Sequence, residues 1–159
     1  MQLILTDGTT TLDLNDTTNY GVTYDQWAPA VGGLREDVLG GYSPYVDVSE
    51  SIPLHVRGAT GAAAMANLAA VGKLLDQAER WARGERVAAV QLWYMPTNST
   101  LGGYLKAVVL GRSGGEGWMG LSPRVNDAAN YEIPGVVLEI KRTNPWLMDS
   151  YLVENYCRN

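Results

Sequence analysis

The chain has 159 residues, of which 46% are hydrophobic and 18% are charged, and this composition excludes an intrinsically disordered protein. The length matches one domain with a single core, since roughly 100–200 residues form a domain. No segment approaches the roughly 18 apolar residues of a membrane-spanning helix, and the N-terminus lacks a basic region followed by an apolar one. We therefore expect neither a membrane anchor nor classical secretion.

The net charge and the scarcity of cysteine and histidine exclude further classes of function. The 12 basic and 17 acidic residues give a net charge of −5. A chain this acidic lacks the basic surface that binds the phosphate backbone of a nucleic acid, so we do not expect nucleic-acid binding. Cys157 is the only cysteine and His55 the only histidine, which excludes an intramolecular disulfide, a cysteine cluster and a histidine-rich metal site. Most triad chemistry within one chain is excluded for the same reason. We expect no enzymatic activity, no metal and no cofactor.

The N-terminal segment predicts a β-hairpin followed by an irregular arm. Residues 2–6 and 9–15 favour strands, and Asp7-Gly8 between them is a strong hairpin signal. Residues 16–45 show no sustained period but carry glycines and aromatic side chains. A loop of this length in a compact domain is expected to lie on its own domain or on a neighbour.

Residues 46–57 return to the alternation of a strand. Ile52, Leu54 and Val56 share one face, whereas His55 points the other way. Pro53 cannot donate a hydrogen bond to a neighbouring strand, so it predicts an edge strand or a solvent-facing N–H side at this point.

The next segment predicts one long helix over residues 61–83, with Thr60 as its N-cap and Gly84 just past its end. We expect Asp76 and Arg80 to form an ion pair on its exposed side. We expect one stripe of apolar side chains to face the core: Ala64, Leu68, Val71, Leu75, Ala78 and Ala82. Met65, Leu74 and Trp81 are expected to widen this stripe.

Three further strands are predicted over residues 86–95, 103–111 and 131–142, the last with a bulge near Pro134-Gly135. The glycine-rich residues 111–117 lack the Lys-Ser/Thr of a phosphate-binding loop and link two strands, so we interpret them as a hairpin tip. The pattern predicts an α+β or mainly β fold. Its architecture is an antiparallel β-sandwich with one long flanking helix and extended arm loops. We place the domain at 1–147 and a C-terminal tail at 148–159.

Two groups of residues could form a functional site. His55 is expected on the outer face of a strand as a solvated or capping residue, and a catalytic role would need an acid or base beside it. Trp93, Tyr104 and Trp118 could instead form a stacking platform, which would make the chain a carbohydrate-binding β-sandwich module. A hydrolase that uses carboxylates is a third and weaker alternative.

Three apolar segments exceed what one small core can cover: residues 16–45, residues 111–123 and the tail from Asn144. An oligomer that packs these segments on neighbouring copies would bury them. Aromatic side chains dominate the centres of interfaces. We therefore expect the subunit interface to include Trp27, Tyr42, Tyr45, Trp118, Met119 and Trp146.

Three stretches resemble tail proteins of long-tailed bacteriophages. Residues 52–58 read IPLHVRG, residues 77–81 read QAERW, and residues 136–146 read VVLEIKRTNPW. The last stretch is similar to the ending of distal tail (Dit-like) minor tail proteins, in which a strand precedes Arg-x-x-Pro-Trp. The order of hairpin, arm, strand, alanine-rich helix and closing strand extends the resemblance over most of residues 1–147.

The resemblance implies a tail-tube-like β-sandwich and a non-enzymatic structural role in the virion tail. Such proteins form a ring, commonly hexameric, that joins the tail tube to the baseplate hub at the tail tip. The implied partners are copies of the chain itself and other tail proteins, and DNA would pass through an acidic lumen without specific binding. Tail tube and tail terminator proteins share this fold type and are the alternatives within the same class.

Overall fold

Strands dominate the part of the chain that the computed structural model describes, which comprises residues 2–22, 47–95, 104–113, 132–143 and 147–148. The elements are β1 (Gln2–Thr6), β2 (Thr11–Asp13), β3 (Tyr20–Val22), β4 (Val48–Arg57), α1 (Gly61–Ala82), β5 (Val90–Met95), β6 (Leu105–Arg112), β7 (Glu132–Arg142) and β8 (Leu147–Met148).

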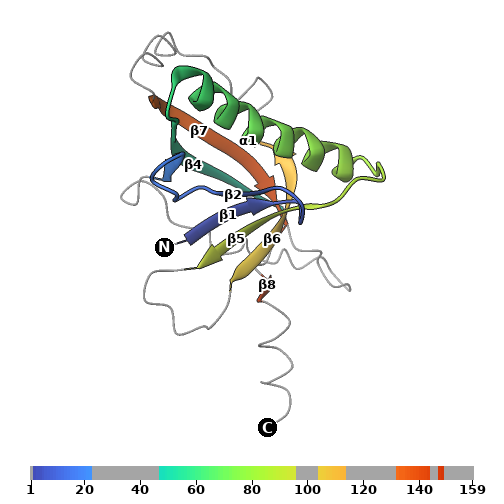
Figure 1. Ribbon diagram of the computed structural model, residues 1–159. Coiled ribbons are helices and arrows are strands. Elements are labelled where there is room, and N and C mark those ends of the chain that lie inside the picture. Colours follow the sequence, from blue (N-terminus) through green and yellow to red (C-terminus); the bar gives the residue numbers. More distant parts are fainter. Residues whose placement is uncertain (1, 23–46, 96–103, 114–131, 144–146, 149–159) are drawn as a thin grey trace, which may run out of the picture.

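All described strands belong to one antiparallel sheet in the order β2-β1-β5-β6-β7-β4-β3, in which β8 also pairs with β6. The sheet curls until it is nearly closed like a barrel, and α1 lies across one of its faces (Figure 1). The predicted class, an antiparallel β protein with one long flanking helix, is confirmed. The strands of the expected sandwich are joined in a single hydrogen-bonded sheet.

The hairpin at the N-terminus forms where the Asp-Gly signal predicts it. Thr6 pairs with Thr11 across the turn. The carboxylate of Asp7 accepts hydrogen bonds from the backbone N–H groups of Thr9 (2.9 Å) and Thr10 (2.6 Å), which is how an aspartate organises a turn. The second strand is shorter than expected, because Thr9 and Thr10 belong to the turn before it and Leu14 and Asn15 to the turn after it.

The segment expected to be an irregular arm contains a short strand near its start. β3 pairs with the end of β4, Tyr20 opposite Val56 and Val22 opposite Leu54. The Tyr20 ring is buried, and its hydroxyl donates to the backbone oxygen of Asn67 in α1 (2.9 Å). Three residues are too few to show a period, so the sequence pattern missed this strand. The rest of the predicted arm, residues 23–45, lies outside the described residues.

β4 lies between β7 and β3, but β3 is paired with it only from Leu54 onward. Pro53 therefore stands next to the described end of β3, opposite Val137 of β7. β4 is therefore an inner strand of the described sheet, and the predicted edge strand is wrong.

The helix begins and ends as its caps predict. The Thr60 hydroxyl accepts the backbone N–H of Ala63 (3.1 Å). Gly58 allows the helix to start directly against β4, since a Cβ there would lie 2.3 Å from the backbone nitrogen of Ala64. The core lies between α1 and the sheet; the helix contributes Ala64, Leu68, Val71, Leu74, Leu75 and Ala78 to it. No helix among the described residues is long and apolar enough to cross a membrane.

Two side chains predicted to widen the buried stripe of α1 are exposed instead: Met65 (39%) and Trp81 (36%). At 100° per residue, they lie about 100° to either side of the stripe. Ala82 continues the stripe but is exposed as well. The last turn of α1 therefore projects past the surface on which the helix packs. Trp81 belongs to this last turn.

The predicted ion pair between Asp76 and Arg80 does not form. Arg112 reaches from β6 to Asp76 and Glu79 (2.7 Å each), and Arg80 binds Glu85 (2.6 Å). Asp76 is thus used to fasten the helix to the sheet, an arrangement that depends on tertiary packing and that helical spacing alone does not reveal.

Candidate functional site

A β-bulge places the residues of the first candidate site. Leu54 is opposite Val136, but Val56 is opposite Ile133, so His55 alone spans Pro134 and Gly135. This confirms the predicted bulge. A shift of one residue exchanges the two faces of a strand. The bulge thereby turns Ile133 into the core, opposite Val56, and brings Glu132 to the outer face beside Arg57.

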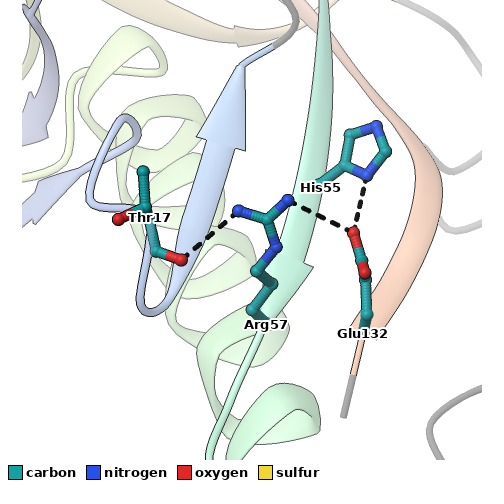
Figure 2. A network of polar contacts seen from close by, with 4 residues as sticks. All are labelled: Thr17, His55, Arg57 and Glu132. Atoms are coloured by element: carbon teal, nitrogen blue, oxygen red, sulfur yellow. Dashed lines mark hydrogen bonds and ion pairs between the residues drawn. The ribbon is translucent and has the colours of Figure 1, made fainter. Parts of the chain in front are cut away.

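We name the resulting group the His55 cluster; it comprises His55, Arg57, Glu132 and the backbone of Thr17 (Figure 2). His55 Nδ1 lies 2.9 Å from Glu132 Oε1, and Arg57 Nη2 lies 3.4 Å from the same oxygen. Arg57 Nη1 donates to the backbone oxygen of Thr17 (3.3 Å). The cluster links β7 and β4 to the turn that precedes β3.

The hydrogen bond with His55 lowers the pKa of Glu132, and the charge of Arg57 lowers it further, while partial burial opposes both. The side chains of His55, Arg57 and Glu132 are 36–40% exposed. The carboxylate is therefore held ionised next to water.

A carboxylate on Nδ1 is the arrangement that orients a histidine for acid–base catalysis. Catalysis would also require a nucleophile or substrate at Nε2, and no described residue forms a hydrogen bond with that nitrogen. Ser51 lies on the same outer face of β4, but its hydroxyl donates to Glu139. What the described residues show is that His55 ties β4 to β7 through Glu132.

The second candidate site is the aromatic platform. The rings of Trp93 and Tyr104 lie 5.6 Å apart, tilted by 45°. Lys106 Nζ lies 4.0 Å above the Trp93 ring and covers part of it. The Trp93 indole N–H donates to Gln91 (2.8 Å). The structure brings together two members of the predicted platform, whereas the third, Trp118, lies outside the described residues.

The residues predicted for the subunit interface, Trp27, Tyr42, Tyr45, Trp118, Met119 and Trp146, lie outside the described residues. No group of three or more His, Cys, Asp or Glu side chains in the described ranges could hold a metal ion.

Sequence reasoning missed a buried ion pair between Glu50 and Arg142, which are 5% and 0% exposed. Strand alternation could have revealed it. Arg142 is in phase with Ile140 on β7, and Glu50 is in phase with Ile52 on β4, so both charged side chains point into the core. Arg142 is also the arginine of the Arg-x-x-Pro-Trp ending.

Comparisons with known proteins found no relative. No protein-family model matches the chain, and neither the curated proteins nor the solved structures contain a significant match.

Proposed function

We propose that the chain is a non-enzymatic structural subunit of a phage virion tail, which assembles with copies of itself into a ring at the distal tail. The proposal rests on the resemblance of three stretches to distal tail proteins. It is supported by one structural observation: the two stretches that form strands, in β4 and β7, are paired side by side, with Ile52 opposite Leu138. The third stretch is at the end of α1, the helix that packs on this sheet.

A subunit of this kind needs a body that keeps its shape under load. Arg112 fastens the helix to β6 through two carboxylates, and the Glu50–Arg142 pair fastens β7 to β4 inside the core. These contacts suit a rigid building block. The net charge of −5 would give a ring of six copies about −30, which would repel DNA from its inner wall. A tail tube or tail terminator subunit is the alternative within this class.

Electron microscopy of the purified chain tests the proposal. We expect closed rings with a central channel, because a contact between two different surfaces closes into a ring when its rotation permits. A field of isolated small particles at every protein concentration would overturn the proposal.

The contact between Trp93 and Tyr104 favours a second candidate, a carbohydrate-binding module. Sugar rings stack on exposed aromatic faces, but Lys106 already lies over Trp93. This candidate therefore ranks below the first. It predicts quenching of tryptophan fluorescence during titration with oligosaccharides, and loss of that quenching in Trp93→Ala.

A further inference from the structure

An exposed tryptophan stands at the end of α1. Trp81 is 36% exposed on the turn that projects past the packed surface. Arg80 and Arg83 both bind the carboxylate of Glu85, whereas Arg86 is exposed and forms no ion pair with any described residue. Trp and Arg are the residue types that most often dominate binding energy at interfaces. We call Trp81, Arg83 and Arg86 the Trp81 knob.

The outer face of the sheet carries a surface that complements the Trp81 knob. Val137 is 37% exposed and stands opposite Pro53 of β4. Glu139, next on the same face of β7, accepts hydrogen bonds from the hydroxyl of Ser51 (2.7 Å to each oxygen) and forms no ion pair with a described residue. We call Pro53, Val137 and Glu139 the Val137 patch. It combines an apolar surface with a negative charge that no described cation neutralises.

The neighbouring charges on this outer face are already paired. Lys141 binds Asp47 (3.0 Å), and Glu132 is held by His55 and Arg57. Glu139 is therefore the carboxylate of β7 that remains for a cation from outside. The knob, in turn, offers the exposed guanidinium of Arg86, five residues after Trp81.

The knob and the patch of one chain lie on opposite sides of its sheet. Leu138 and Ile140 of β7 point into the core under α1, so Val137 and Glu139 between them point to the outer face. Figure 1 shows α1 along the other side of β7 and β4. The two surfaces can meet only between two copies of the chain, and such a contact joins unlike surfaces.

We propose that Trp81 of one copy packs on Pro53 and Val137 of the next, with Arg86 beside Glu139. This inference rests on the self-assembly in the proposed function and names the surfaces that carry it. Charge complementarity supports a second copy as the partner. Residues 73–86, which include the knob, hold 4 of the 12 basic and 3 of the 17 acidic residues. The rest of the chain has 8 basic and 14 acidic residues, so its net negative charge attracts the basic knob of another copy.

The test compares the assembly of full-length variants by light scattering after size-exclusion chromatography, with circular dichroism to verify folding. Trp81→Ala should raise the concentration needed for assembly by about 30-fold or more, which is the effect of a hot-spot tryptophan. Arg86→Glu should weaken assembly by about 10-fold at low salt and less at high salt. Lys73→Glu is the matched control, because it makes the same charge change at an exposed position of α1 that lies outside the knob.

A mixing experiment tests whether the contact joins unlike surfaces. Trp81→Ala retains the patch, and Val137→Arg retains the knob; each alone should remain monomeric. Their mixture should give heterodimers and nothing larger, because only one productive contact remains. Assembly of Trp81→Ala at the wild-type concentration would overturn this inference while the proposed function stands. A wild-type chain that never assembles would overturn both.

Discussion

Arg142 and Glu50 form an ion pair inside the core. Arg142 Nε lies 2.8 Å and Nη2 lies 3.2 Å from the two carboxylate oxygens of Glu50. Arg142 is paired along the backbone with Val48 of β4 and with Val109 of β6. The ion pair therefore lies where β7 is paired with a strand on each side.

Removal of one partner from this pair should be costly. Glu50→Gln removes the carboxylate charge that Arg142 Nε and Nη2 bind in the core, and we expect the free energy of unfolding to fall by about 3–5 kcal/mol. Urea denaturation measures the change. Glu139→Gln is the control, since that carboxylate accepts its short hydrogen bonds from the exposed hydroxyl of Ser51 and its replacement should cost about 1 kcal/mol or less. Equal losses in both variants would contradict the structural role of the pair.

Gly111 provides a second test, because its backbone and its surroundings both exclude a side chain. Its φ is +129°, and a Cβ would lie 2.4 Å from Cγ of Glu79. Gly111→Ala should therefore lower the free energy of unfolding by about 2 kcal/mol or more, through backbone strain and displacement of Glu79 from Arg112. Gly8→Ala isolates the backbone effect, since its φ is +88° but nothing lies within 4 Å of the added Cβ. If Gly8→Ala proves as destabilising as Gly111→Ala, the contact with Glu79 has no energetic role.

The His55 cluster predicts a dependence of stability on pH. The pKa of Glu132 is lowered in the folded chain from its ordinary 4.5, chiefly by the hydrogen bond with His55. The stabilisation from a lowered pKa is present above the unfolded pKa and is lost as the pH falls through the folded one. The wild-type melting temperature should thus fall more steeply than that of Glu132→Gln between about pH 5 and pH 3. Parallel curves for the two proteins would contradict the effect.

The sequence predicts the local elements well because their signals are local. Asp7-Gly8 marks the hairpin, Thr60 caps the helix, and alternation places Ile52 and Leu54 in the core. Trp81 was expected to widen the buried stripe, but at 100° per residue it lies on the flank of the helix, and its exposure matches that position.

The candidate site depends on contacts between distant residues. Alternation places His55 on the outer face, but its partner Glu132 is 77 residues further along the chain. Only the bulge at Pro134-Gly135 turns Glu132 toward it, and a bulge predicted from sequence does not reveal which residue it brings to the surface. Arg112 similarly reaches Asp76 through tertiary packing, which overrides the expected pair within the helix.

The most direct test of the proposed assembly is the native mass of the full-length chain over a range of concentrations, for example by sedimentation equilibrium. We predict one closed species of about 100 kDa, which corresponds to six copies of the 17.3 kDa chain. A mass of 17.3 kDa that persists at high concentration would contradict the proposal that this protein works as a ring of copies.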